Sequence, residues 1–306
     1  MNQRRIERRP IDGVLLLDKP TGMTSNGALQ RAKRLYNAQK AGHTGTLDPL
    51  ASGLLPLCFG EATKFAQRLL DAPKGYLATI RFGATTTTGD AEGEIRETRP
   101  VSFTHADLDS TLARFVGPLM QTPPIYSALK VEGRPMYRYA RAGEDVPRTP
   151  RAIVVHALDL VEWAGSDAIV AVSCSKGTYV RVLAEDIGAA LGCGAHLAGL
   201  RRTATGGFRL DDAVSLERIE AMSDADRLGL LRPAAILVAE MARLAVDEAE
   251  ARRFGQGQAL PAPASADGEY AVFAGDRLLG VADVADGLAR PRRVIVAGLP
   301  DEAREA

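Results

Sequence analysis

The chain has 306 residues with a formal net charge of zero, and 46% of the residues are hydrophobic and 25% charged. This composition is typical of a globular chain with a full hydrophobic core and room for two domains, and it argues against a disordered protein. The sequence contains no apolar run of 18 residues, and the short run at 14–17 lies between Asp12 and Asp18, so we predict neither a membrane span nor a signal peptide.

The cysteines are too few and too scattered for a disulfide framework or a zinc site. Cys58, Cys174 and Cys193 form no Cys-x-x-Cys pair, and their number is odd. We therefore expect a protein of the reducing cytoplasm that needs no metal.

The charges are unevenly distributed along the chain. Residues 211–250 carry a net charge of −6 and residues 301–306 a net charge of −2, so the remainder carries +8. Each basic cluster alone is more often a solvated face, but together they are compatible with one RNA-facing side. The clusters are Arg4, Arg5, Arg8 and Arg9; Arg31, Lys33 and Arg34; Arg201 and Arg202; and Arg292 and Arg293.

The first elements follow from the apolar pattern. After a basic arm at 1–10, the apolar run predicts a short strand over 11–18, which ends at the sequence KPTG. Ser25 is a good N-cap for a helix over 26–37 that buries one face and turns Arg31 and Arg34 outward.

Residues 42–56 then place a single carboxylate, Asp48, among small and apolar residues. The glycines of this stretch permit unusual backbone angles, while Pro49 disfavours a helical conformation at Asp48, so we predict a shaped loop. Asp48 is the candidate catalytic residue. The competing interpretation is that it caps a helix or turn that begins at Pro49.

This loop resembles the signature of one family, the bacterial TruB family of tRNA pseudouridine synthases. The matching residues 42–49 read GHTGTLDP, and residues 13–25 match the family's opening motif with the sequence GVLLLDKPTGMTS. The resemblance implies that Asp48 is the nucleophile and that His43 helps to extrude the target uridine. Lys19, in the opening motif, is as well suited to supporting the loop as to contacting RNA.

The next two elements contribute further candidates. An apolar stripe predicts a helix over 61–70 with Lys64 on its polar side, and β-branched and aromatic residues predict a strand over 75–82. Tyr76 in this strand has the pattern of an ordinary core tyrosine. The resemblance instead implies that it lies against the flipped base, a role that suits an aromatic face with a polar tip.

The segment 85–93 departs from the family pattern. Thr87 stands where the family usually has an aspartate, whereas Asp90 and Gly93 are kept. The resemblance implies that Asp90 belongs to the charge network around the site. An aspartate that accepts a hydrogen bond within its own turn is the alternative.

A helix over 104–116 precedes a long excursion at about 122–150. Its first residues, 121–130, contain the family's motif in full and read QTPPIYSALK. The resemblance implies a thumb that closes over an RNA stem-loop, with Lys130 among its substrate contacts. Interleaved aromatic and basic residues suit stacking and phosphate contact, although helical packing would explain them nearly as well.

Strands predicted over 153–162 and 168–173 lead into a second specific motif, CSKGTYVRVLAEDIG, at 174–188. Thr178 is the expected cap of a helix whose first turn contains Tyr179 and Arg181. Arg181 has two candidate partners, Glu185 four residues on or, by resemblance, Asp48. The second pairing would hold Asp48 ionised and lower its pKa. Tyr179 is a substrate-binding candidate, and Lys176 is expected to add positive potential near the phosphate.

The last match lies at 199–208, where the resemblance implies that Leu200 contacts the target uracil; core packing is the alternative. An acidic, mostly helical stretch follows residue 211, and the composition changes near residue 246. Short strands at about 270–273, 278–282 and 293–296 predict a small β domain, which looks like the family's PUA-type RNA-binding module.

We therefore predict an α+β fold. A catalytic domain at 1–245, built around a mixed, largely antiparallel sheet with a thumb-like insertion at 122–150, precedes a PUA-like domain at 246–306. The implied reaction is isomerisation of uridine to pseudouridine in the T-arm stem-loop of tRNA, expected at position 55 of the TΨC loop. It needs no cofactor or obligatory protein partner, and we expect a monomer.

Three alternatives stay open at this point. A glycoside-type hydrolase would use Asp48 and Asp90 as a carboxylate pair and release free uracil. An RNA-binding or folding factor would need only the basic grooves and the tail domain. Within the isomerases, an RNA-guided relative similar to dyskerin is less favoured than the stand-alone type, and attack at C1′, attack at C6 and a glycal route are equally compatible with the residues.

Overall fold

The computed structural model describes residues 8–127, 129–131, 133–144, 146–262 and 267–295. Its centre is a ten-stranded sheet in the order β14-β1-β3-β12-β4-β11-β10-β7, with β2 paired to β3 and β13 to β12. Strands β1 and β14, and β3 and β12, run parallel, whereas the other paired neighbours are antiparallel. The predicted mixed, largely antiparallel sheet is therefore confirmed. Its strands are β1 (Gly13–Lys19), β2 (Ala41–His43), β3 (Ala51–Phe59), β4 (Lys74–Phe82), β7 (Gly117–Gln121), β10 (Arg151–Ala164), β11 (Asp167–Cys174), β12 (Ala195–Thr205), β13 (Phe208–Arg209) and β14 (Val214–Ser215).

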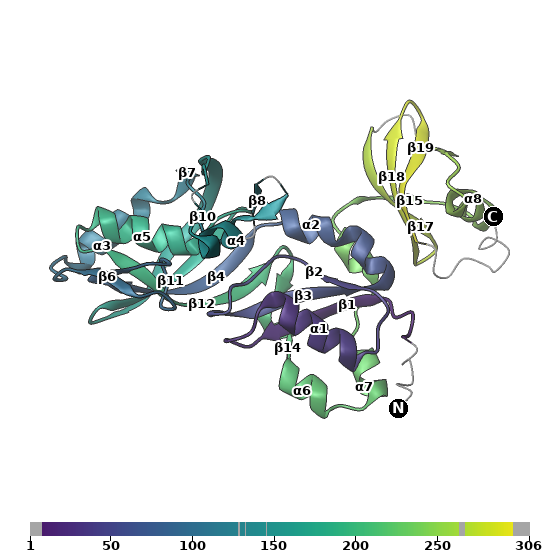
Figure 1. Ribbon diagram of the computed structural model, residues 1–306. Helices are drawn as coiled ribbons and strands as arrows, with labels where there is room; N and C mark the ends of the chain where they lie inside the picture. Colours follow the sequence, from purple (N-terminus) through teal and green to yellow (C-terminus); the bar gives the residue numbers. More distant parts are fainter. Residues whose placement is uncertain (1–7, 128, 132, 145, 263–266, 296–306) are drawn as a thin grey trace.

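Helices cover the two ends of this sheet separately (Figure 1). At one end α1 (Ser25–Leu35) and α6 (Leu216–Ala221) pack with β1 and β3 around one apolar core, and α7 (Asp224–Gly229) lies beyond them. At the other end α3 (His105–Arg114) and α5 (Val180–Ala190) close a second core over β4, β10 and β11. Tyr76 and Leu200 are partly buried and pack against both cores. The two halves of the sheet therefore meet at these two side chains.

Shorter elements fill the connections. They are η1 (Gly60–Phe65), α2 (Ala66–Asp71), the paired strands β5 (Ala84–Thr86) and β6 (Ile95–Thr98), η2 (Leu210–Asp212) and η3 (Ala234–Val238). The segment predicted as a thumb leaves the main sheet between β7 and β10. Its described part forms the paired strands β8 (Lys130–Val131) and β9 (Arg134–Pro135), followed by α4 (Met136–Ala142).

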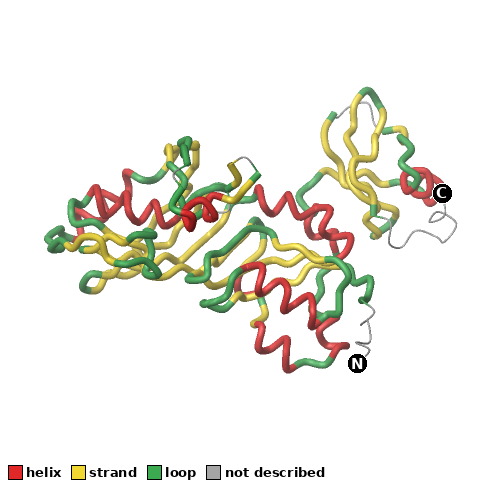
Figure 2. Tube along the Cα trace, viewed as in Figure 1, coloured by secondary structure: helices red, strands yellow, loops and turns green. Residues whose placement is uncertain are grey.

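A second sheet of five strands forms the C-terminal part, seen as a separate group of strands in Figure 2. Its strand order is β15-β17-β18-β19-β16, and α8 (Glu248–Gly255) packs on it around a core of its own. The strands are β15 (Ala242–Ala245), β16 (Leu260–Pro261), β17 (Gly268–Ala274), β18 (Arg277–Ala285) and β19 (Leu288–Val294). Because β15 belongs to this sheet, the second sheet begins four residues before the boundary predicted at 246. The strand predicted over 293–296 ends at Val294, and residues 296–306 lie outside the described part.

The two sheets are joined by a shared apolar cluster and by polar contacts. Phe65 and Leu69 of the first part pack with Phe273 of the second. The Lys64 ammonium donates to the carbonyl oxygen of Val294 at 2.7 Å, and Arg68 pairs with Glu269 at 2.9 Å.

Several local predictions are corrected by the structure. The stretch 42–56 is mostly strand, because β2 includes His43 and β3 begins at Ala51, so the loop proper is short. The predicted helix over 61–70 is η1 followed by α2. The N-cap of α1 is Thr24, whose side chain accepts from the Gly27 amide, and not Ser25.

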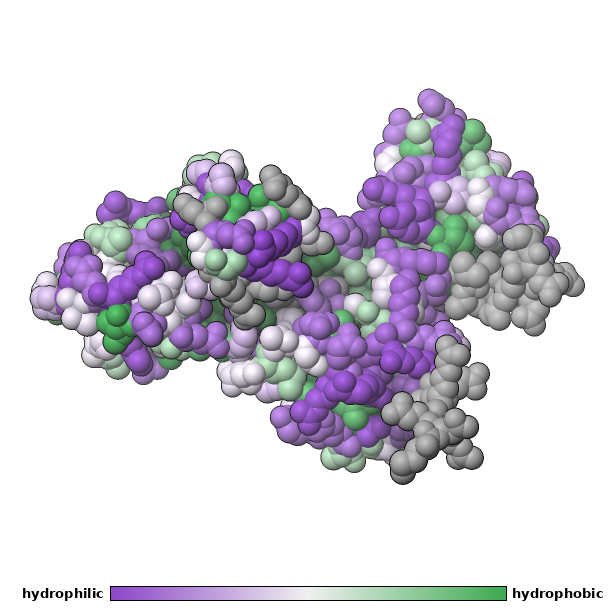
Figure 3. Space-filling view, viewed as in Figure 1, coloured by the Kyte–Doolittle hydropathy of each residue, from purple (hydrophilic) through white to green (hydrophobic). Residues whose placement is uncertain are grey.

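Several basic residues on the surface are paired with acidic ones, in agreement with the net charge of zero. On the face seen in Figure 3, hydrophilic residues cover most of the region around α1. Arg31 pairs with Glu220 and Arg292 with Glu269, so both already have acidic partners within the fold. Arg4 and Arg5 lie outside the described residues. No helix in the described ranges is long and apolar enough to cross a membrane.

Gly53 provides a test of the packing between β3 and β12. Its φ is +99°, and a Cβ atom there would lie 2.4 Å from the carbonyl oxygen of Arg202. Because both the backbone angle and the space exclude a side chain, we expect Gly53→Ala to lower the free energy of unfolding by about 3 kcal/mol. Gly165→Ala is the matched control, since Gly165 also has a positive φ but nothing within 4 Å, and it should cost about 1 kcal/mol. Urea denaturation followed by circular dichroism measures both; equal midpoints for the two variants would contradict this account.

Candidate active site

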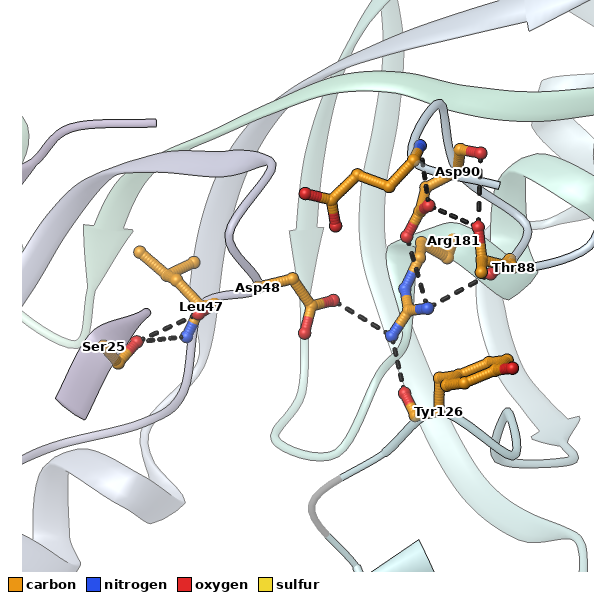
Figure 4. A network of polar contacts seen from close by, with 8 residues as sticks. Ser25, Leu47, Asp48, Thr88, Asp90, Tyr126 and Arg181 are labelled. Carbon is orange, nitrogen blue, oxygen red and sulfur yellow. Dashed lines mark hydrogen bonds and ion pairs between the residues drawn. The ribbon is translucent and has the colours of Figure 1, made fainter. Parts of the chain in front are cut away.

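Asp48 lies in a short loop that is anchored on both sides. The Ser25 hydroxyl donates to the carbonyl oxygen of Leu47 at 3.0 Å and accepts from the Leu47 amide at 2.7 Å. On the other side the Gly22 amide donates to the carbonyl oxygen of Pro49, and the Ala51 amide to that of Asp48. Asp48 therefore starts a turn that leads into β3, rather than a helix, and its side chain points toward Arg181 (Figure 4).

Arg181 is the partner of Asp48. Its guanidinium is 7% exposed, and Nη2 lies 3.0 Å from Oδ2 of Asp48 while Nη1 lies 3.3 Å from Oδ2 of Asp90. Two further bonds run to the carbonyl oxygens of Thr88 and Tyr126. The predicted pair of Arg181 and Asp48 is present, and the alternative pair with Glu185 is not formed. Figure 4 shows the guanidinium at the centre of these contacts.

The start of α5 places Arg181 at the site. The Tyr179 amide donates to Oε1 of Gln121 at 2.7 Å, and Nε2 of Gln121 donates back to the Tyr179 carbonyl oxygen at 3.0 Å. Tyr179 is thus the residue that precedes the helix. Thr178 is not its cap, as the sequence predicted, because its hydroxyl donates to the Ser175 carbonyl oxygen in the preceding turn.

Asp90 both belongs to the charge network and accepts hydrogen bonds within its own turn, the two alternatives considered from the sequence. Its Oδ1 accepts from the Glu92 amide and the Thr88 hydroxyl, as in a self-bonded turn, while Oδ2 faces Arg181. Its side chain is 4% exposed, compared with 44% for Asp48. The two carboxylates on Arg181 therefore differ: Asp90 is enclosed and fully bonded, and Asp48 is open to an incoming group.

The pKa of Asp48 differs from the sequence prediction. Burial by the surrounding protein raises this pKa above its ordinary value, and the neighbouring Asp90 raises it further. Arg181 opposes both effects through its charge and hydrogen bond, with a smaller contribution from Lys19. The expected lowering by Arg181 is real, but it is outweighed by desolvation.

Tyr76 and Leu200 lie on the neighbouring strands β4 and β12, and Asp48 is close enough to Tyr76 to contribute to raising the pKa of its hydroxyl. Leu200 of β12 is opposite Ala78 of β4, and Arg202 is opposite Tyr76. Arg202 is the residue that sequence reasoning misplaced, because it was grouped with Arg201 in a surface cluster and is 1% exposed. A signal was available: in a strand, residues two apart face the same side, so Arg202 shares the face of Leu200 and Arg201 does not.

The chain has clear relatives among known proteins. Residues 33–180 match the family described as TruB family pseudouridylate synthase (N terminal domain). Residues 181–237 match the tRNA pseudouridylate synthase B C-terminal domain, and residues 242–295 match pseudouridine synthase II TruB, C-terminal. A relative named tRNA pseudouridine synthase B from Azoarcus sp. (strain BH72) is 55% identical over 293 residues, covering 96% of this chain and 98% of the relative. The chain belongs to the TruB family.

A second relative with the same name, from Burkholderia mallei (strain ATCC 23344), is also 55% identical, over 96% of this chain and 97% of its own length. Among solved structures, the protein in "Crystal Structure of a Cbf5-Nop10-Gar1 Complex" superposes with a TM-score of 0.70 at 24% identity, covering 95% of this chain and 92% of that one. "Structure of H/ACA RNP bound to a substrate RNA containing 2'-deoxyuridine" gives 0.70 at 22% identity, covering 98% and 94%. These similarities show the pseudouridine synthase fold.

The departure from the TruB pattern at Thr87 is accommodated locally. Its hydroxyl accepts from the Glu94 amide at 3.1 Å, and its own amide donates to the Glu94 carbonyl oxygen. The loop with Asp90 is held independently, because the Leu197 amide donates to the Gly89 carbonyl oxygen and the Ala91 amide donates to that of Leu197. An aspartate at 87 is therefore not needed to position Asp90 in this chain.

Of the lysines predicted to bind substrate, one is buried in the protein and two others lie away from Asp48 and Arg181. Lys19 is fully buried and donates to the carbonyl oxygens of Pro20 and Met23, so it supports the loop; burial and Arg202 lower its pKa to about 8. Lys64 contacts Glu61 and Val294, and Lys176 pairs with Asp71 at 2.8 Å, so neither contacts Asp48 or Arg181. The side chain of Lys130 lies outside the described part.

His43 lies near Arg202, and Tyr179 lies near Asp48 and Arg181. Burial, with the charge of Arg202, lowers the pKa of His43, and its Nδ1 has no hydrogen-bond partner among the described residues. The Tyr179 hydroxyl interacts with the side chain of Ser127, and Asp48 adds to the effect of burial in raising its pKa. Within the described ranges no group of three or more metal-ligating side chains converges.

Removal of the arginine tests the origin of the Asp48 pKa. Arg181→Gln deletes the positive charge that opposes desolvation, so we expect the Asp48 pKa to rise further. Arg181→Lys, which keeps the charge, should give a smaller rise. Carbon-13 NMR of labelled aspartate measures the titration, with Asp48→Asn assigning the signal. An Asp48 pKa that stayed constant or fell in Arg181→Gln would contradict this description of the site.

Proposed function

We propose that this protein converts uridine to pseudouridine in tRNA, at position 55 in the TΨC loop of the T arm, with Asp48 as the nucleophile and no cofactor. The observation that carries the proposal is the geometry of Asp48: its carboxylate is oriented by a buried arginine and is still 44% exposed. Leu47 and Leu50 of its loop pack against the two cores that Tyr76 and Leu200 also contact. Membership of the TruB family and two near full-length relatives named tRNA pseudouridine synthase B support it.

The reaction breaks the N1–C1′ bond, turns the uracil while it stays bound, and joins C5 to C1′. Asp48 supplies the nucleophilic carboxylate, and Arg181 orients it through one oxygen. Leu200 and Tyr76 form the apolar surface against which the detached base turns, and the Tyr76 oxygen accepts the proton that leaves C5. Because the target lies in a folded loop, it must be flipped out, at a cost of a few kcal/mol that these contacts offset.

Of the remaining candidates, some contact the RNA in this proposal and others hold the site in place. His43 and Tyr179 line the entrance beside Asp48, Asp90 keeps Arg181 in place, and Lys19 fixes the loop from inside. Lys64, Lys130 and Lys176 lie on elements outside the core of the site, where they would meet phosphates. The C-terminal sheet acts as a PUA-like RNA-binding module. We expect a cytoplasmic monomer without an obligatory protein partner.

The enclosure of Asp90 favours isomerisation over hydrolysis. A hydrolase needs its second carboxylate free to activate water or protonate the leaving group. Both oxygens of Asp90 are already bonded, to Glu92, Thr88 and Arg181, and the side chain is 4% exposed. Asp48 is thus the single accessible carboxylate of this pair.

Tritium release from tRNA labelled at C5 of uridine tests the proposal. We expect release by the wild type and a loss of at least about 10³-fold in Asp48→Asn, with RNA binding retained, because removal of a nucleophile abolishes the covalent step. A transcript with cytidine at position 55 should release no tritium from the target site. Asp167→Asn is the matched control, since Asp167 also pairs with an arginine, Arg81, but this pair is half-exposed at the ends of β11 and β4.

Each of the other outcomes would indicate a different function for this protein. Free uracil with an abasic product would replace the isomerase by a hydrolase. Tight RNA binding without turnover by the wild type would replace it by a binding or folding factor. Tritium release that persists in full with the cytidine-55 transcript would show that the target uridine lies at another position.

A further inference from the structure

Arg202 has a position that no role described so far requires. It lies directly opposite Tyr76 in the antiparallel pair of β12 and β4, so the two side chains project from the same face. The parallel neighbour on its other side is Gly53, whose missing side chain lets β3 approach the Arg202 backbone. The register of three strands therefore brings a guanidinium beside the Tyr76 hydroxyl.

The charge of Arg202 is buried without a carboxylate partner. Its side chain is 1% exposed, and it donates from Nε to the Leu54 carbonyl oxygen at 2.6 Å and from Nη2 to that of Gly45 at 3.3 Å. Its remaining interaction is with the Tyr76 hydroxyl. No acidic side chain pairs with it among the described residues, although an unpaired buried charge is costly. Such a cation is matched only when a neighbouring group becomes negative.

Tyr76 is the neighbour that fits. Burial raises the pKa of this tyrosine, and Asp48 from the loop and Cys174 from β11 raise it further, whereas Arg202 from β12 lowers it. The other titratable groups near Arg202 are Lys19, His43 and Lys74, and it lowers the pKa of all three.

The other cations near the site are already committed. Lys19 donates to Pro20 and Met23 carbonyl oxygens, Lys74 to those of Leu69, Leu70 and Ala72, and Arg181 faces two carboxylates. Arg201, although adjacent in sequence, pairs with Asp18 on the opposite face of the strand. Arg202 is therefore the cation available to the Tyr76 oxygen.

We propose that Arg202 is the positioning residue for Tyr76: it holds the phenol oxygen in place and supplies the positive charge that lets this oxygen accept the proton from C5. The inference rests on the proposed function and assigns the last step of that reaction. The C5–H bond breaks and its proton passes to the Tyr76 phenolate, while the electron pair forms the C5–C6 double bond and the C6–N1 double bond opens onto N1. The charge displaced to N1 takes a proton from water, and the hydroxide left behind removes the proton from Tyr76.

The first test measures Tyr76 itself, without RNA. The ultraviolet absorbance of tyrosinate is titrated in proteins with and without Tyr76→Phe, and the difference isolates Tyr76 from the other six tyrosines of the seven in the chain. Arg202→Gln, which keeps hydrogen-bonding groups but removes the charge, should raise the ionisation midpoint of Tyr76 by about one pH unit or more. Arg81→Gln is the control, because Arg81 is on the same strand as Tyr76 but pairs with Asp167. An unchanged midpoint in folded Arg202→Gln overturns the inference.

The second test measures single-turnover pseudouridine formation against pH. For each pH unit by which the Tyr76 midpoint rises, Arg202→Gln should lose about tenfold in rate at neutral pH, and it should regain that rate at higher pH. Its tRNA Kd should stay within about threefold of the wild-type value. A residue that merely braces the loop would lose rate equally at every pH, which overturns the inference. If the wild type itself forms no pseudouridine, the proposed function is overturned. The wild-type measurement therefore distinguishes failure of the proposed function from failure of the inference about Arg202.

Arg202→Lys decides the matter if the glutamine variant does not fold. A lysine retains the charge at neutral pH but, as for Lys19 and Lys74 with pKa values of about 8, loses its proton in this buried region under mildly alkaline conditions. We expect near wild-type rates at pH 7 and a new fall in rate above about pH 8 that arginine does not show. A profile parallel to that of the wild type overturns the proposed role of the charge.

Discussion

The site depends on one buried cation, the Arg181 guanidinium, being shared by two unlike carboxylates. Burying a charge is costly, and at Arg181 the fold offsets the cost by bringing Asp90 from one loop and Asp48 from another to the same guanidinium. Asp90 is also held by two bonds to its Oδ1 from within its own turn. The consequence is an asymmetric pair, in which one carboxylate fixes the arginine and the other, still 44% exposed, is fixed by it and left free for chemistry.

The location of this pair follows from how the sheet is assembled. Two apolar cores form at opposite ends, and β3 and β12 run parallel where the halves join. Tyr76 and Leu200 fill the space where the two cores meet, because each packs against both of them. Both side chains are only partly buried there. The loop of Asp48 crosses the same join, and the double hydrogen bond between Ser25 and Leu47 ties it to α1. The packing between the two halves and the placement of Asp48 thus depend on the same part of the sheet.

The fold class and the pairing of Asp48 with Arg181 could be predicted because long motifs carry them, and a motif preserves partners that are far apart in the chain. The failures are of another kind. Ser25 and Thr178 are both good caps by residue type, but their hydroxyls bond to Leu47 and to Ser175 instead. A propensity describes only the residue type. The bond of Ser25 depends on a tertiary contact with Leu47, and that of Thr178 draws its hydroxyl back into the turn before the helix. The rise in the Asp48 pKa was missed for the same reason, since a sequence shows the opposite charge but not the desolvation.

Arg202 shows the same limit in the treatment of charge. A pair of arginines in a sequence is typical of a surface, yet strand alternation sends Arg201 toward Asp18 and Arg202 into the protein beside Tyr76. Other basic residues that the sequence offers to RNA already have acidic partners, as Lys176 has in Asp71. Phosphates would have to compete with these carboxylates, so each such contact contributes less than an unpaired cation would. In a chain of zero net charge, the paired surface cations therefore leave less charge for phosphates, and Arg181 and Arg202 are too buried to add to it.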